Sequence, residues 1–233
     1  MTDLDEIKGE IGNIIRPQWT TREGEKVPET TEVELGNSAV KLAATVLFAD
    51  LIESTTLVNT KRDNFAAEVY KSFLRAACRV IMRNGGTITA FDGDRVMAVY
   101  LGNSKNTQAV GSALEINYVV REIINPMIKE IYPKSSYEIR QVIGVDTSPL
   151  FVARAGVRGS NDLVWIGRAA NYAAKLSSLR EPDCAQWITA DVHEAIANRE
   201  ELLRSGKGVE LWTRYDWTGR GMKIFGANAW RWT

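Results

Sequence analysis

Two spacings of apolar residues run along the chain, and each predicts a different kind of element. The run 44-ATVLFAD-50 is apolar up to its last residue, which predicts a strand buried on both faces. Over residues 64–83 the apolar side chains recur every three or four positions, which predicts a helix that ends at the Asn-Gly-Gly of 84–86. Residues 87–92 and 94–101 alternate around a glycine and predict a β-hairpin.

The second half of the chain continues this mixture of strands and helices. The elements predicted there are a helix over 107–131, strands over 138–146, 149–156 and 162–166, a helix over 168–179, and a strand, a short helix and aromatic-rich strands within 186–233. Pro126 lies inside the first of these helices and is expected to kink or break it. The order predicts an α+β fold in which helices flank a mainly antiparallel central sheet.

Length and composition indicate a globular protein of the reducing cytoplasm. With 233 residues the chain suits one sizeable domain, and we expect residues 1–40 to form a polar N-terminal arm before a domain of residues 41–233. Lys and Arg together number 29, as do Asp and Glu, so no net charge favours nucleic acid as a partner. Two cysteines are too few for a disulfide framework. We expect neither a signal peptide nor a membrane span.

Two aspartates are the first candidates for chemistry. Asp50 closes an apolar strand, and Asp94 follows the glycine of the predicted hairpin. If the two strands are neighbours, the carboxylates meet at one edge of the sheet, where a divalent cation relieves their repulsion. Mg²⁺ and Mn²⁺ prefer such oxygen ligands together with substrate phosphates. Aspartate is also common at strand ends and turns for capping reasons alone, so each residue taken singly has an ordinary explanation.

Two further segments suit the binding of phosphate groups. After Asp50 the chain turns toward a helix, and Ser54 and Thr55 could add hydroxyl donors to backbone N–H groups, although a plain helix cap explains them too. On the predicted helix, Asn171 and Lys175 are four residues apart and share one face with Arg168. An amide and cations presented together suit the charged phosphorus of a displacement reaction. A solvated polar stripe is the alternative.

Taken in order, these segments resemble the catalytic domain of class III nucleotidyl cyclases. The resemblance lies in 46-VLFADLIEST-55, in 91-FDGDRVMAVY-100 and in 164-VWIGRAANYAAKL-176, and it covers about residues 43–180. It implies a ferredoxin-like α+β domain that cyclises a nucleoside triphosphate. It also implies that Asp50, Asp94 and the backbone carbonyl of Leu51 hold two Mn²⁺ or Mg²⁺ ions. By the same resemblance, Asn171 and Lys175 come from the other protomer, so the protein would be a homodimer with composite active sites.

The chain departs from this family at several positions. The transition-state cation is commonly arginine and here is Lys175, for which Arg168 is a candidate compensation. The pair that reads a purine base is replaced by Ala90 and Val164, which offer no hydrogen bonds to a purine edge. The lysine that contacts the triphosphate has Lys223 as its best counterpart, with Arg220 second. The Gly-Pro of the strand pair reads Ser-Pro at 148–149.

The missing purine pair makes the chain most similar to the bacterial pyrimidine cyclases of Pycsar antiphage systems, which make cyclic UMP or cyclic CMP to activate a separate effector. UTP is favoured only because makers of cyclic UMP are the commoner type in that group. Arg95 is a candidate contact for a pyrimidine carbonyl or phosphate, and Phe48 for the ribose or base; an exposed strand residue and a core phenylalanine are their ordinary explanations. The alternatives are a cytidylate cyclase, a purine cyclase with atypical base contacts, an inactive cyclase-like module, and a structural domain without a site.

Overall fold

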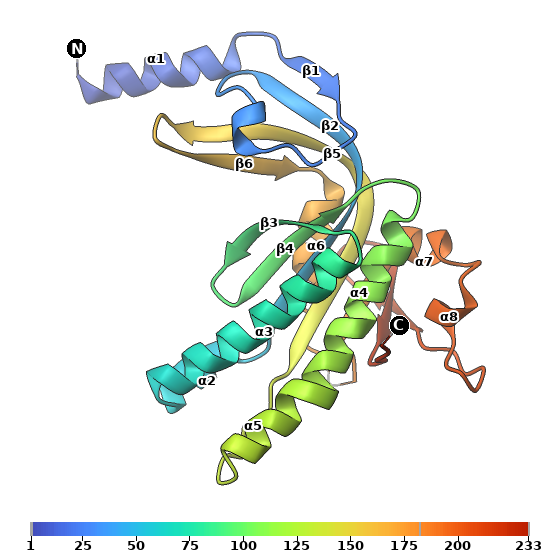
Figure 1. The fold of residues 1–233 in the computed structure, drawn as a ribbon. Helices are drawn as coiled ribbons and strands as arrows, with labels where there is room; N and C mark the ends of the chain where they lie inside the picture. Colours follow the sequence, from blue (N-terminus) through green and yellow to red (C-terminus); the bar gives the residue numbers. More distant parts are fainter. Residues whose placement is uncertain (1, 182, 233) are drawn as a thin grey trace.

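The computed structural model describes residues 2–181 and 183–232, and within these ranges it shows one mixed sheet of nine strands with helices on both faces (Figure 1). The strands are β1 (Thr20–Glu23), β2 (Ser38–Leu51), β3 (Thr87–Asp92), β4 (Arg95–Tyr100), β5 (Gln141–Val157), β6 (Ser160–Ile166), β7 (Gln186–Thr189), β8 (Thr213–Trp217) and β9 (Met222–Ala227). Their order is β3-β4-β2-β5-β7-β9-β8, with β1 beside β2 and β6 beside β5. Only the pairs β1–β2 and β5–β7 are parallel, so the sheet is mainly antiparallel, as predicted.

The helices lie between these strands in the order that the sequence indicates. They are α1 (Asp3–Ile15), α2 (Ser54–Thr60), α3 (Asp63–Arg83), α4 (Lys105–Val119), α5 (Asn125–Ile131), α6 (Arg168–Leu176), α7 (Ala190–Ala195) and α8 (Glu200–Leu203), with a 3₁₀ turn at Thr30–Glu32. The predicted hairpin and the helix over 64–83 are confirmed as β3–β4 and α3. None of the helices in the described ranges combines the length and the apolar character that a membrane span requires.

The predicted helix over 107–131 is interrupted where Pro126 disturbs it. A π-helical turn, Val120–Ile124, separates α4 from α5, and Pro126 occupies the first turn of α5. Proline lacks an N–H group and its ring crowds the carbonyl of the preceding turn, so the hydrogen-bond register changes there.

One strand prediction is wrong. Instead of two strands over 138–146 and 149–156, a single strand, β5, runs through Pro149. It pairs with β2 from Gln141 to Ala153, but on its other side it pairs with β7 only up to Val145 and with β6 only from Phe151. Between these two partners β5 is locally an edge strand, where proline is tolerated.

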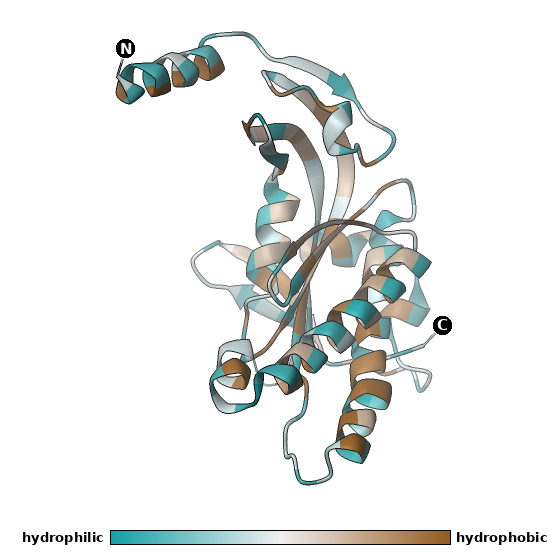
Figure 2. Cartoon of the chain, turned by 60° about the vertical axis from the view of Figure 1, so that its left-hand side comes forward, coloured by the Kyte–Doolittle hydropathy of each residue, from teal (hydrophilic) through white to brown (hydrophobic). Residues whose placement is uncertain are grey.

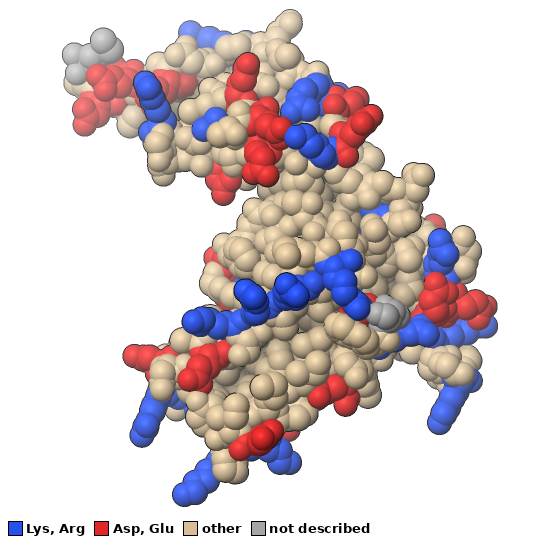
Figure 3. All heavy atoms as spheres, viewed as in Figure 1, with Lys and Arg blue, Asp and Glu red and all other residues tan. Residues whose placement is uncertain are grey.

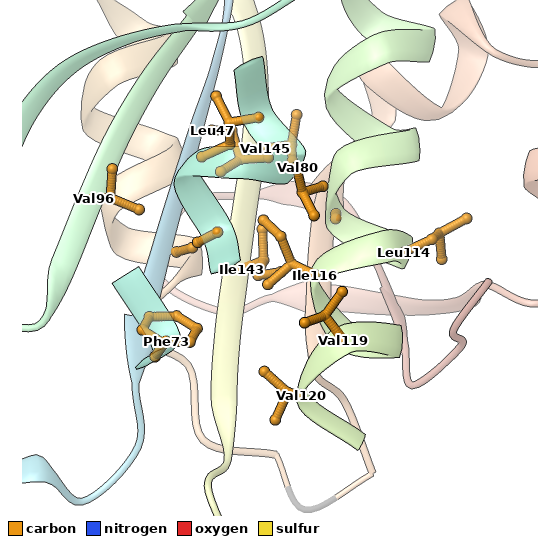
Figure 4. Packing of buried hydrophobic residues seen from close by; sticks show 14 of the residues in the cluster. Leu47, Phe73, Val80, Val96, Leu114, Ile116, Val119, Val120, Ile143 and Val145 are labelled. Atoms are coloured by element: carbon orange, nitrogen blue, oxygen red, sulfur yellow. The ribbon is translucent and has the colours of Figure 1, made fainter. Parts of the chain in front are cut away.

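Two apolar clusters fix the helices on the two faces of the sheet. On one face Leu47 and Val145 pack against Val80 of α3 and Ile116 of α4 (Figure 4). On the other face Val46 belongs to a cluster with the alanines of α6. Successive side chains on β2 therefore point into different cores, which is why its sequence is continuously apolar.

The long strands β2 and β5 extend beyond this packed body into an arm that also carries β1, β6 and α1 (Figure 1). Surface charge is uneven on the body. A row of exposed cations follows the outer side of α3 at every fourth residue, namely Lys71, Arg75, Arg79 and Arg83 (Figure 3). Arg83 ends this row in an ion pair with Glu115.

Candidate active site

The end of β2 and the turn of the β3–β4 hairpin bring Asp50 and Asp94 together. β2 and β4 are hydrogen-bonded neighbours, with Ala49 opposite Val96, so the end of one strand lies beside the start of the other. Burial, and after it the negative charge of Asp94, raises the pKa of Asp50. This effect of Asp94 on Asp50 shows that the two carboxylates lie close together, as the sequence predicts.

Asp94 carries an unpaired oxygen. Its Oδ2 atom is buried and has no hydrogen-bond partner among the described residues. A buried carboxylate oxygen without a partner costs about 1–3 kcal/mol, and binding of another group would recover that cost. An unpaired oxygen beside a second carboxylate is the arrangement that a divalent cation would complete.

Three side chains surround the two aspartates. The guanidinium of Arg95 lies 5.6 Å from the centre of the Phe48 ring and donates to Asp92 at 2.8 Å. Arg180 Nη2 lies 3.4 Å from Asp50 Oδ2. Sequence reasoning found Phe48 and Arg95 but missed Arg180, because that residue follows α6 in an irregular segment with no periodic signal.

The residues present fit a divalent cation that takes some of its ligands from other groups. Within the described parts of the chain, no group of three or more His, Cys, Asp or Glu side chains is arranged to hold a metal ion. Asp50 and Asp94 would therefore need further oxygens from the backbone and from a substrate. The side chain of Leu51 is buried in the core, and its carbonyl remains the predicted backbone ligand.

The segment after Leu51 turns sharply into α2. Glu53 has φ 59°, and among the described residues it is the only one besides glycine with a positive φ. Arg140 Nη2 lies 3.0 Å from Glu53 Oε2 in an exposed ion pair beside this turn. Ser54 and Thr55 form the first turn of α2; Ser54 is partly buried and Thr55 is exposed. Their contact with phosphate stays a prediction.

The polar face of α6 points away from the sheet of its own chain. Ala169, Ala173 and Leu176 are buried against the sheet, whereas Asn171 and Lys175 are exposed on the opposite side of the helix. Asn171 Nδ2 donates to the carbonyl of Gly167 at 3.2 Å. Because these two side chains face outward, they are available to a second molecule.

Arg168 lies on the same helix but is tied to its own chain. Its guanidinium donates to Asp146 Oδ2 at 3.1 Å and to the carbonyl of Thr147 at 2.7 Å, and it also pairs with Asp191. Burial raises the pKa of Asp146, and hydrogen bonds from Thr189 and Arg168 oppose that rise. In this structure Arg168 therefore anchors α6 to β5.

The other predicted contacts are distributed over β3, β6 and the β8–β9 hairpin. Ala90 is exposed on β3, and Val164 is 38% exposed on β6. Lys223 is paired with Asp216 across the β8–β9 hairpin. Arg220, at the tip of that hairpin, lies over the ring of Tyr172 on α6, 5.5 Å from its centre, so the hairpin brings a cation next to the helix that carries Asn171.

A cavity of about 680 Å³ adjoins this region. Its lining includes Ile52, Glu53, Arg140 and Arg180, so it begins where the segment after Asp50 ends. Neither Asp50 nor Asp94 lines it. The two carboxylates lie beside the cavity, on the sheet face that α6 partly covers.

The fold is that of class III nucleotidyl cyclase domains. No protein-family model matches the chain. The adenylyl cyclase CyaB from P. aeruginosa has the same fold, with a TM-score of 0.65 at 19% identity over 81% of this chain and 95% of that one. A guanylate cyclase domain from Catenaria anguillulae, solved in complex with GTP, has a TM-score of 0.62 at 17% identity over 82% of this chain and 99% of that one.

Relatives at much higher identity narrow the class. The uridylate cyclase of Burkholderia cepacia is 45% identical over 100% of both chains. That of Xanthomonas perforans is 42% identical over 98% of this chain and 97% of its own, and that of a Rhodovulum strain is 37% identical over 99% and 98%. The chain belongs to the uridylate cyclase family, and it is a nucleotidyl cyclase.

Proposed function

We propose that this protein converts UTP to 3′,5′-cyclic UMP and pyrophosphate. The observation that carries this proposal is the paired Asp50 and Asp94, with one unpaired buried oxygen, in a chain 45% identical to a uridylate cyclase over its whole length. In the reaction the ribose 3′-oxygen forms a bond to the α-phosphorus, and the bond from that phosphorus to the bridging oxygen breaks. Pyrophosphate leaves with the electron pair, and the hydroxyl proton passes to solvent.

The residues of this chain divide the work as follows. Asp50, Asp94 and the Leu51 carbonyl would hold two divalent ions, Mn²⁺ or Mg²⁺, which when bound favour ionisation of the 3′-hydroxyl and neutralise the triphosphate. Arg180 must release Asp50 to make room for this charge. The outward position of α6 supports a homodimer in which Asn171 of one copy orients the ribose bound by the other, and Lys175 stabilises the charge on the phosphorus.

The base contacts support a pyrimidine. Neither Ala90 nor Val164 can hydrogen-bond to a purine edge, so a purine gains little specificity from those positions. Arg95 and Phe48 lie close together beside Asp50 and would contact the nucleotide as a donor and an apolar surface. Ser54 and Thr55, with Lys223 or Arg220, are the proposed contacts to the triphosphate.

We place this activity in the cytoplasm, as production of a second messenger in antiphage defence that a separate cyclic-nucleotide-activated effector would detect. The similarity of the sequence to pyrimidine cyclases of such systems supports this role. A cytidylate cyclase is the nearest alternative, because the absence of a purine-reading pair favours both pyrimidines equally.

Product analysis tests the proposal. Purified protein would be incubated with Mn²⁺ and each of ATP, GTP, CTP and UTP, and the products identified by mass spectrometry. We expect cyclic UMP from UTP, its loss in Asp50→Ala, and its retention in Asp162→Asn, which changes an exposed aspartate of β6. Cyclic CMP as the main product would replace UTP by CTP, and a cyclic purine would overturn the argument from Ala90 and Val164.

A further inference from the structure

The helix α1 carries an apolar seam that its own chain leaves uncovered. Leu4, Ile7, Ile11 and Ile14 follow one another at intervals of three, four and three residues, which is the heptad spacing of a coiled-coil seam. Their exposed fractions are 59%, 50%, 49% and 60%. Scattered single apolar residues on a surface need no explanation, but four in one row on one helix do.

The structure shows how little holds α1 to the rest of the chain. None of its residues is buried, and it stands away from the body with its apolar residues along one side (Figure 2). Its end is tied down by Asn37, whose Nδ2 donates to the carbonyls of Ile14 at 2.8 Å and Pro17 at 2.9 Å. At its start, Thr2 and Asp5 form a capping box.

A helix of this length needs packing to be stable. Isolated helices shorter than about 12–15 residues are marginal in water, and most helical stability in proteins comes from covering an amphipathic face. The capping box contributes about 1 kcal/mol and does not replace that packing. The sequence of α1 therefore indicates that its apolar side packs against another helix with the same spacing of apolar residues.

The charges beside the seam favour another α1 in parallel orientation. With Leu4 and Ile11 at the a positions, Asp3 falls at g and Lys8 at e. In a parallel pair, g of one helix meets e of the next heptad in the other, so Asp3 meets Lys8. In an antiparallel pair the g positions meet one another, and Asp3 would face Glu10.

We infer that α1 pairs in parallel, through Leu4, Ile7, Ile11 and Ile14, with the α1 helices of other copies of this chain. The seam is self-complementary, as contacts between identical subunits require. Isoleucine at the d positions favours more than two strands, so the assembly is expected to extend beyond a pair of helices. Two heptads bind weakly alone, and the cyclase domains add to them by raising the effective concentration.

Disulfide trapping tests the contact without any nucleotide, so its failure is distinguishable from failure of the proposed function. Ile7→Cys in the full chain places a thiol at a d position. The matched control, Gly9→Cys, places one on the outer side, where an added Cβ meets nothing within 4 Å. We expect mild oxidation to cross-link most of the first variant and no more of the second than of the unchanged chain. Equal cross-linking of both variants would overturn the inference.

Sedimentation measures the contribution of the seam to assembly. Ile7→Asp with Ile11→Asp places two charges on the seam, and Gly9→Asp with Asn13→Asp places two on the outer side. Because α1 has no buried residue, both variants should keep the fold of the body. We expect the seam variant to form an assembly of lower mass, or to have a dissociation constant at least about tenfold higher. The control variant should match the unchanged chain. Identical masses for all three across a range of concentrations would contradict the inference.

Discussion

At the scale of single residues, the site consists of charges whose partners are incomplete in one chain. Asp50 and Asp94 share one environment, and Asp94 has a buried oxygen that no described residue satisfies. Arg180 is the nearest cation to Asp50, but at 3.4 Å with both side chains partly exposed it offers only a weak pair. The closeness of the two carboxylates and the unpaired oxygen of Asp94 cost stability in the isolated protein and favour binding of a cation.

Removal of the Asp94 carboxylate should show separately how much it destabilises the fold and whether it binds a metal ion. We expect Asp94→Asn to raise the free energy of unfolding by about 1 kcal/mol without metal, because the repulsion with Asp50 disappears. The same variant should lose the increase in melting temperature that Mn²⁺ gives the unchanged protein. Thermal unfolding with and without Mn²⁺ measures both effects, and an equal Mn²⁺ response in the two proteins would argue against Asp94 as a ligand.

The raised pKa of Asp50 makes metal binding depend on pH. A carboxyl whose pKa is raised on folding favours the folded state when protonated, and this contribution is lost as pH rises through the folded pKa. Metal requires the ionised form, so the two effects oppose one another. Since the pKa of Asp50 lies above 3.8, we expect the Mn²⁺-induced increase in melting temperature to weaken already above that pH. A constant increase from about pH 7 to about pH 4 would contradict this expectation.

Substitution of Arg168 tests whether this residue serves the stability of the fold or the chemical reaction. Because its removal leaves the buried Asp146 without its cation, while Arg168 itself is partly exposed, we expect Arg168→Ala to lower the free energy of unfolding by about 1–3 kcal/mol. Adding Asp146→Asn should restore part of that loss. Urea unfolding measures the stability, and turnover of the double variant measures the chemistry. Full turnover there would show that Arg168 does not compensate for the lysine at position 175.

At the scale of elements, the position of α6 is set by how closely it approaches β5. Gly144 of β5 lies beneath the helix, and a Cβ added there would come within 2.6 Å of the backbone nitrogen of Ser177. The alanines of α6 that face the sheet also permit this close approach, since their small side chains let the helix lie close to β5. This contact directs Asn171 and Lys175 outward.

A methyl group at position 144 should therefore disturb the element without touching the site. We expect Gly144→Ala to lower the free energy of unfolding by about 1–3 kcal/mol through overpacking. The control is Gly111→Ala on α4, where the nearest atom to an added Cβ is 3.9 Å away and where alanine favours the helix by about 1 kcal/mol. Opposite signs in urea unfolding are expected, and a neutral Gly144→Ala would refute the close approach.

At the scale of the whole molecule, the two groups of residues in the proposed site face different directions in one chain. The carboxylates lie at the end of β2, while Asn171 and Lys175 face away from the sheet. The long arm that carries α1 extends from the same strands, β2 and β5, that position the site (Figure 1).

Mixing two inactive variants tests the composite site directly. Asp50→Ala lacks a metal ligand and Lys175→Ala lacks the transition-state cation. If the two groups act in trans, equal mixing gives half mixed dimers, each with one complete site, and restores about a quarter of normal activity. Cyclic nucleotide formation measures the recovery, with each variant alone as the control. No recovery after exchange of subunits would place both groups in one chain.

The sequence by itself determined which elements form, because apolar spacing specifies strands and helices locally. It placed Asp50 at a strand end and Asp94 at a hairpin turn, and their proximity followed from the pairing of those strands. It also put Asn171 and Lys175 on one face of α6. Its error at β5 arose because proline usually ends a strand, and only the sheet shows that Pro149 lies where β5 changes partners.

What only the tertiary structure decided is the set of contacts between segments distant in sequence. Nothing in the sequence distinguishes the partners of Arg168 and Arg180. In the structure Arg168 is paired with Asp146, whereas Arg180 lies beside Asp50. The direction of α6, the burial of the Asp94 Oδ2 atom and the exposure of the α1 seam depend on which surfaces the rest of the chain covers. Local periodicity determines the elements, whereas burial and pairing across the sheet determine which side chains remain available for chemistry and assembly.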